Sequence, residues 1–156
     1  MRLSLLAVGR LRGGPPAALY DDYAGRLRGQ PLGPLTLREV EEKRPLAAEA
    51  LKAREAELLL AVCPTGARLV ALDGGGRALA SAALAETLGR WRDEAVPETA
   101  FAIGGAEGHG AALLARADLT LSLGPMTWPH LLVRVLLAEQ LYRADSILSG
   151  HPYHRA

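Results

Sequence analysis

The chain has 156 residues, of which 49% are hydrophobic and 22% are charged, and its formal net charge is +1. This length predicts a single domain, residues 1–156, that can bury about two-thirds of its unfolded surface. The small net charge excludes a general electrostatic attraction to nucleic acid, so any contact with RNA must be local.

Cysteine content and hydropathy narrow the class of protein further. The single cysteine, Cys63, excludes a disulfide framework or a cysteine-rich metal site within one chain, and we expect no metal. The longest apolar stretch is interrupted by Arg134 and Glu139 and stays below the roughly 18 residues of a membrane span. The apolar N-terminal run is too short for a signal peptide, and Arg10 follows it closely. We therefore expect a cytoplasmic protein without a membrane partner.

Hydrophobic patterns predict strands and helices that alternate five times along the chain. Short apolar or alternating runs predict the strands, and longer runs with apolar residues three and four apart predict the helices. The predicted strands cover residues 2–8, 35–40, 68–73, 99–103 and 119–123. The predicted helices cover residues 15–27, 45–62, 81–91, 111–117 and 129–147. This alternation is typical of an α/β fold with a mostly parallel sheet and helices on both faces.

The last predicted helix is apolar on almost every side in its first half. Only His130 and Arg134 interrupt the apolar residues there, four positions apart and so on one face. A helix that is apolar all round is buried on all sides, so we expect one face on the sheet and another on a partner subunit. Thr127 is the expected N-cap of this helix. Ser81 is the expected N-cap of the helix predicted at 81–91.

Three loops rich in glycine or proline follow three predicted strands, at residues 73–76, 104–110 and 124–129. In open α/β sheets, ligands bind outside the carboxyl ends of the strands, and glycine lets a ligand approach the backbone closely. The dinucleotide fingerprint fails, because Gly9 is followed by Arg10, Leu11, Arg12 and Gly13. The loops therefore favour a ligand with an adenine or similar ring and little phosphate, unless the glycines only make turns.

The C-terminal tail after Gly150 is rich in side chains that can do chemistry. It carries His151, Tyr153, His154 and Arg155 within the last six residues. Chain ends usually fray and seldom take part in chemistry, so the alternative is a solvated polar tail.

The strings PHLLVRVLLAEQLYRADSI and HPYHR in this C-terminal part resemble the signature of the SPOUT methyltransferases of the RlmH type. That type methylates N3 of a pseudouridine in the RNA of the large ribosomal subunit. The resemblance covers essentially the whole chain, including Val8-Gly9, Leu72-Asp73 and the Gly104–Gly108 stretch. It implies a C-terminal trefoil knot over residues of about 72–156. It also implies a homodimer that uses S-adenosyl-L-methionine and acts on 23S rRNA, in our interpretation on the assembled 70S ribosome.

The resemblance also implies site residues. S-adenosylmethionine would be held by Leu72, Gly104, Gly105, Gly124, Pro125, Met126, Thr127, Trp128 and Pro129. Trp128 stands where the family more often has leucine, and we still expect it to form a wall of the adenine pocket.

In the tail, we expect His154 to act as a base or an orienting group, because its ordinary pKa lies near neutrality. Arg155 would hold a phosphate or a developing oxyanion, and Tyr153 would stack on a base or position the others. Arg143 and His151 are candidates for contacts with the RNA, although Arg143 can equally form a salt bridge with Glu139.

Two other interpretations remain open at this point. One is another α/β nucleotide-binding enzyme, flavodoxin-like or dehydrogenase-like, against which the missing fingerprint argues. The other is a non-catalytic dimeric module that binds RNA or the ribosome. In the enzyme interpretation His130 fixes a loop, and His109 has no assigned role.

Overall fold

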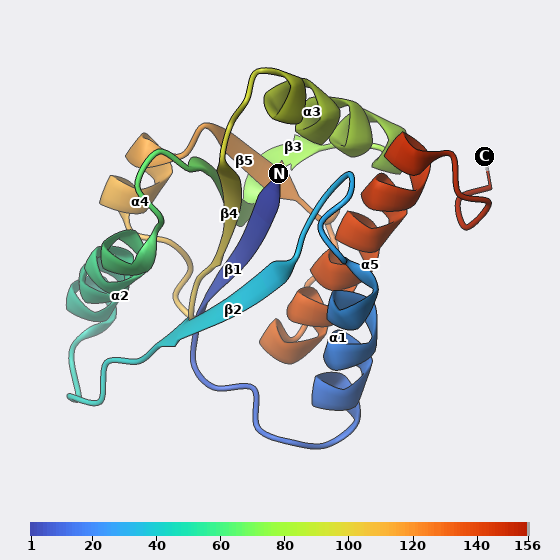
Figure 1. Ribbon diagram of the computed structural model, residues 1–156. Helices are drawn as coiled ribbons and strands as arrows, with labels where there is room; N and C mark the ends of the chain where they lie inside the picture. Colours follow the sequence, from blue (N-terminus) through green and yellow to red (C-terminus); the bar gives the residue numbers. More distant parts are fainter. Residues whose placement is uncertain (156) are drawn as a thin grey trace.

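A computed structural model describes residues 1–155, and these form five strands that alternate with five helices (Figure 1). The strands are β1 (Arg2–Val8), β2 (Leu35–Val40), β3 (Arg68–Ala78), β4 (Glu98–Ile103) and β5 (Leu119–Ser122). The helices are α1 (Pro15–Arg26), α2 (Ala48–Val62), α3 (Ser81–Asp93), α4 (Ala111–Arg116) and α5 (His130–Ser149). The predicted alternation is confirmed.

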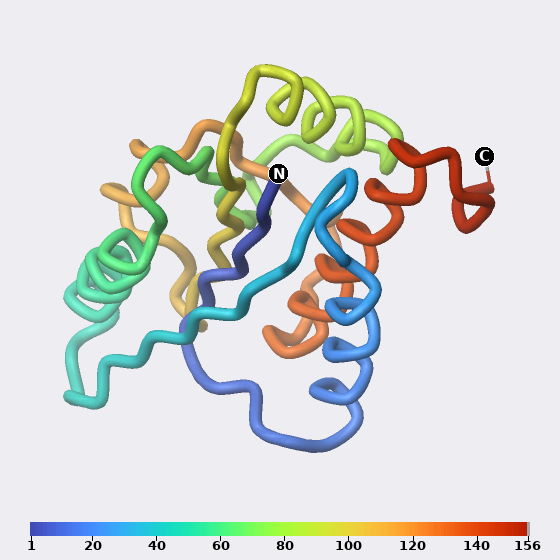
Figure 2. Tube along the Cα trace, viewed as in Figure 1, coloured from blue at the N-terminus to red at the C-terminus, as the bar shows by residue number. Residues whose placement is uncertain are grey.

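The strands form one parallel sheet with the order β2-β1-β4-β3-β5. Side chains of a strand point alternately to the two faces, so each strand contributes to two hydrophobic cores. On β1, Leu3 and Leu5 pack into the core under α1, α3 and α5, whereas Leu6 packs into the core under α2 and α4. Helices therefore cover both faces, as the α/β interpretation predicts, and α1 and α5 lie side by side on one of them (Figure 2).

The third strand corrects the sequence-based interpretation of residues 73–76 as a loop. β3 continues through the three glycines to Ala78, and after a register shift Arg77 and Ala78 pair with β5. A Cβ atom at Gly76 would lie 2.6 Å from the carbonyl carbon of Thr120. Glycine is therefore needed at this position, because the backbone of β3 comes very close to that of β5 after the register shift. Glycine inside a strand often marks such a close approach.

Both predicted helix caps are wrong. The residue before α5 is Pro129, with ψ 141°, and the residue before α3 is Ala80, with ψ 153°. Thr127 therefore lies two residues too early to cap α5. Ser81 is the first residue of α3, and its hydroxyl donates to Oε1 of Gln140 at 2.7 Å, which ties α3 to α5.

The last helix, α5, ends at a glycine. Gly150 adopts a left-handed conformation with φ 72°, and its N–H donates to the carbonyl of Ile147. Glycine is favoured at this position because it carries no Cβ. The helix ends there, and the tail leaves it at the edge of the molecule (Figure 2).

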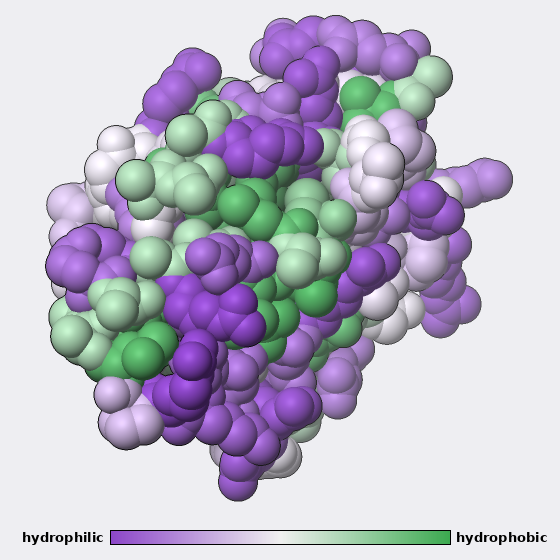
Figure 3. Space-filling view, turned by 90° about the vertical axis from the view of Figure 1, so that its left-hand side faces the viewer, coloured by the Kyte–Doolittle hydropathy of each residue, from purple (hydrophilic) through white to green (hydrophobic). Residues whose placement is uncertain are grey.

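Figure 3 shows the face that carries α2 and α4, where hydrophobic side chains in the centre are surrounded by hydrophilic ones. Within residues 1–155, none of the helices is long and apolar enough to cross a membrane.

Candidate functional site

The carboxyl ends of β3, β4 and β5 enclose a cavity of about 380 Å³. These ends meet because β3 lies between β4 and β5 in the sheet. Eight of the nine residues predicted to hold the cofactor line it, namely Leu72, Gly104, Gly105, Gly124, Pro125, Met126, Thr127 and Trp128. The ninth, Pro129, precedes the first turn of α5, and His130 and Val133 form the wall there instead.

His109, which has no role in the sequence-based interpretation, is part of this wall. Only 7% of the residue is exposed, and its Nε2 lies 3.2 Å from the carbonyl of Ala102. A carbonyl only accepts, so Nε2 carries the hydrogen and Nδ1 keeps a lone pair, which has no partner among residues 1–155. Burial lowers the pKa of His109, so the ring is neutral at pH 7. A buried, neutral imidazole therefore lies in the wall of the cavity.

The two glycines after β4 are needed mainly for packing against neighbouring residues. A Cβ at Gly104 would lie 3.0 Å from the carbonyl of Gly108 and 3.2 Å from Nδ1 of His109. A Cβ at Gly105 would lie 2.7 Å from the carboxylate of Glu55 on α2. Burial raises the pKa of Glu55. Helix α2 thus packs against the glycine loop that lines the cavity.

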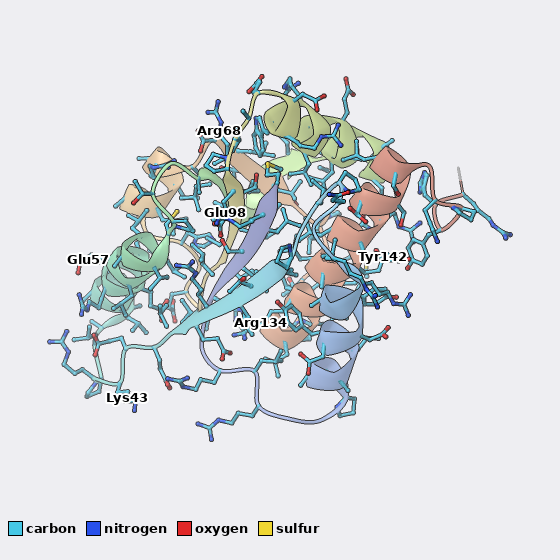
Figure 4. All side chains as sticks on the ribbon, in the orientation of Figure 1. Lys43, Glu57, Arg68, Glu98, Arg134 and Tyr142 are labelled. Atoms are coloured by element: carbon cyan, nitrogen blue, oxygen red, sulfur yellow. The ribbon has the colours of Figure 1, made fainter. Side chains whose placement is uncertain are left out.

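Arg134, which the sequence presented only as an interruption of an apolar helix, is 1% exposed. Its Nη1 donates to the Glu39 carboxylate at 2.7 Å, and its Nη2 donates to the carbonyls of Val8 and Gly9 at 3.0 Å. The N–H of Leu11 donates to the same carboxylate. These bonds tie the start of α5 to the ends of β1 and β2 (Figure 4).

The charge state of Glu39 follows from these contacts. Burial alone would raise the pKa of Glu39, but the hydrogen bonds from Leu11 and Arg134 outweigh it and hold the pKa below its usual value. The pair is therefore ionised at neutral pH. It fixes the first turns of α5 and, with them, the loop that closes the cavity.

The predicted tail residues lie at the opposite end of α5 from the cavity. The helix has 20 residues, so at ~1.5 Å per residue it separates the two by about 30 Å. Tyr153 and His154 are half-buried against α5, whereas His151 and Arg155 are exposed. The structure therefore brings the tail residues to one another and keeps them away from the cavity of the same chain.

Within the tail region, Glu139 is the common partner. Its carboxylate accepts from the Tyr153 hydroxyl at 3.0 Å and from Nη2 of Arg143 at 2.5 Å. The Arg143 guanidinium lies 4.9 Å from the centre of the Tyr153 ring. The centres of the Tyr142 and Tyr153 rings lie 4.7 Å apart. Of the two roles predicted for Arg143, the salt bridge is present.

Large apolar side chains are exposed around the mouth of the cavity and on the first turn of α5. The exposed fractions are 71% for Met126, 39% for Trp128, 38% for Leu131 and 40% for Leu132. A second cavity of about 420 Å³ lies behind Trp128, between α3 and α5. Exposed apolar surface of this kind commonly marks a contact with another macromolecule. In the described part of the chain, His, Cys, Asp and Glu residues form no group that could hold a metal ion.

Comparisons with known proteins agree with this geometry. A family model described as "Predicted SPOUT methyltransferase" matches residues 1–154. The chain is 61% identical over 156 residues to a protein of Rhodospirillum rubrum and 58% identical over 156 residues to one of Rhodospirillum centenum, with complete coverage of both chains in each case. Both relatives are named ribosomal RNA large subunit methyltransferase H.

A solved structure supports the fold alone. The structure of a probable methylase family protein from Haemophilus influenzae superimposes with a TM-score of 0.52 at 13% identity. The match covers 99% of this chain and 70% of that one.

Proposed function

Because the chain belongs to the SPOUT methyltransferase family, we propose that it transfers a methyl group from S-adenosylmethionine to N3 of a pseudouridine in the 23S rRNA of the large ribosomal subunit. The observation that carries this proposal is the cavity at the carboxyl edge of the sheet, lined by eight of the nine residues that the family resemblance implies. The full-length relatives named as large-subunit rRNA methyltransferases support the choice of substrate.

The cavity suits S-adenosylmethionine in size and chemistry. Its volume of about 380 Å³ lies in the range of small-molecule sites. Leu72 and Trp128 offer apolar walls for a flat ring, and the loops at Gly104–Gly105 and Gly124–Thr127 offer backbone groups. When bound, S-adenosylmethionine supplies a methyl group activated by a sulfonium.

The chemistry left to the protein is mainly alignment, because the methyl group is already activated. N3 of the base forms a bond to the methyl carbon while the bond from that carbon to sulfur breaks, and that electron pair stays on sulfur. The proton on N3 leaves to solvent water. We assign His154 and Arg155 to the target base and its charge, Tyr153 to positioning them, and Arg143 and His151 to the tail surface that faces the RNA.

The tail must then come from a second copy of the chain. About 30 Å of helix separates the tail from the cavity of its own chain, so one chain alone does not hold a complete site. The exposed apolar surface at Met126, Trp128, Leu131 and Leu132 supports a homodimer. In a two-fold dimer the same contacts occur twice, once in each direction. Two complete sites would therefore form, each with the cavity of one protomer and the tail of its partner.

Three further parts of the proposal rest on the family. The region of about 72–156 forms the trefoil knot, which the return of α5 from the edge strand β5 to the side of α1 supports. The substrate is the assembled 70S ribosome, because a single small domain has little RNA surface of its own. Such a substrate would place the protein in the cytoplasm.

The modified nucleotide can be identified directly. We expect that 70S ribosomes from a strain without this activity, incubated with the protein and S-adenosylmethionine, gain one N3-methylated pseudouridine in 23S rRNA. Nuclease digestion and mass spectrometry would find it. Methylation of uridine alone, or of small-subunit RNA alone, would contradict the proposed substrate.

A further inference from the structure

The contacts around the tail assign roles that go beyond the family resemblance. We propose that Glu139 and Arg143 are positioning residues that hold the tail, and that they leave His154 to act as a hydrogen-bond donor to the target base and not as the base that removes its proton. This inference rests on the proposed function, since it concerns the same reaction.

Glu139, Tyr142, Arg143 and Tyr153 form a cluster that we call the tail clasp. The first three lie three and four residues apart on α5 and therefore share one face of the helix. The Tyr153 ring contacts both Tyr142, at 4.7 Å, and the Arg143 guanidinium, at 4.9 Å, while its hydroxyl donates to Glu139. One side chain of the tail is thus held through a tilted contact between two rings, a cation–π contact and a charge-assisted hydrogen bond.

Tyr153 is excluded as the base by these contacts. Burial, and then the hydrogen bonds to Tyr23 and Glu139, raise the pKa of the Tyr153 hydroxyl well above its usual value. The phenol therefore stays protonated at neutral pH and already donates its hydrogen to Glu139. Its contribution is to dock the tail.

The orientation of His154 follows from the same cluster. Nη1 of Arg143 lies 3.4 Å from Nδ1 of His154. A guanidinium can donate but cannot accept, so Nδ1 is the acceptor and the ring hydrogen of neutral His154 is on Nε2. A nitrogen that carries a hydrogen can donate it to an oxygen but has no lone pair with which to take the N3 proton.

A donor is useful in this reaction. When the N3 proton leaves to solvent water, negative charge spreads onto the two carbonyl oxygens that flank N3. That charge disappears as the N3 electron pair bonds to the methyl carbon and the carbon–sulfur bond breaks, so part of it remains on the oxygens in the transition state. A preorganised N–H aimed at such an oxygen stabilises the transition state, and removing one donor of this kind typically costs about 10²–10³-fold in kcat. The tail clasp would supply the preorganisation of His154.

The first arm of the test needs neither RNA nor cofactor. Heteronuclear NOE values measured by NMR on the amides of His151, Tyr153, His154 and Arg155 should indicate a rigid tail in the unmodified protein and a mobile one in Glu139→Gln. Glu86→Gln removes a carboxylate from an exposed position on α3 and is the matched control, with a rigid tail expected. Equal tail mobility in the unmodified protein and in Glu139→Gln would overturn the positioning role.

The second arm compares His154→Gln, His154→Asn and His154→Ala in methyl transfer to ribosomes. The glutamine amide reaches the place of Nε2 and can donate, but it cannot take a proton. We expect His154→Gln to keep kcat within about 10-fold, and Asn and Ala to lose about 100-fold or more, with the Kd for S-adenosylmethionine unchanged. Equal losses in all three variants, or activity kept by Asn and lost by Gln, would overturn the donor role.

The two arms separate this inference from the proposed function. The unmodified protein, assayed on the same ribosomes, reports on the proposed function itself. If it transfers no methyl group, the proposed function fails, and the tail mobility still decides whether Glu139 positions the tail. If it is active, the pattern over the three His154 variants decides the donor role.

Discussion

Replacing Arg134 with methionine should lower the free energy of unfolding by about 3–5 kcal/mol at neutral pH. The guanidinium is 1% exposed and makes hydrogen bonds to the Glu39 carboxylate and to the carbonyls of Val8 and Gly9. Methionine fills much of the same space, so the loss comes chiefly from a carboxylate and two carbonyls left desolvated. A domain of this size has roughly 5–15 kcal/mol in total, so the effect is large.

The pH dependence of this loss has a definite sign. The pKa of Glu39 is lowered in the folded protein, so the stability it contributes is present above its unfolded-state pKa of about 4.3 and is lost as pH falls through the lower folded pKa. The difference between the unmodified protein and Arg134→Met should therefore be largest at pH 7 and shrink in acid. The double variant Arg134→Met/Glu39→Gln should recover part of the loss, because the uncompensated charge is gone.

Urea denaturation at one fixed protein concentration, at pH 7 and again in acid, measures both effects. A loss below about 1 kcal/mol at pH 7 is what an exposed ion pair gives, and it would refute the reasoning from burial. A loss that stays constant as the pH falls would refute the assignment of the effect to Glu39.

Three other predictions concern the cavity, the dimer and the sheet. Trp128→Ala removes an apolar wall and should weaken binding of S-adenosylmethionine about 10-fold in calorimetry; an unchanged Kd would remove Trp128 from the site. Leu132→Asp puts a charge on the exposed apolar surface and should give inactive monomers, so a monomer in gel filtration that still methylates ribosomes would contradict the shared site. Gly76→Ala places a Cβ 2.6 Å from the backbone of β5 and should lower the free energy of unfolding by about 1–3 kcal/mol, measured by thermal unfolding. The control Gly74→Ala places its Cβ in open space and should lower it less. Equal losses of stability would contradict the close crossing.

The order of elements and the cavity wall could be predicted because both depend on local sequence. Strands such as Arg2–Val8 are short apolar runs, and the loops at Gly104 and Gly124 follow strand ends, which parallel strands bring to one edge of the sheet. The boundary of β3 could not be predicted, because glycines usually end strands. Here they continue one, and only the register shift against β5 explains it.

Contacts between residues far apart in the chain could not be predicted from the sequence. Arg134 and Glu39 are 95 residues apart. Helical periodicity places the charge of Arg134 on an apolar face, but it does not indicate which residue pairs with it. Glu55 and Gly105 meet only because α2 packs beside the loop after β4. The sequence singles out the tail residues as a group, and their role stays a prediction. It could not reveal that a 20-residue helix separates them from the cavity of their own chain.

Transfer of a labelled methyl group from S-adenosylmethionine tests the central claim most directly. The assay would offer intact 70S ribosomes, separate subunits and naked rRNA, each from a strain that lacks this activity. The account predicts label in large-subunit RNA, mainly from 70S particles. The absence of label from every RNA, with a protein that still binds S-adenosylmethionine, would contradict it.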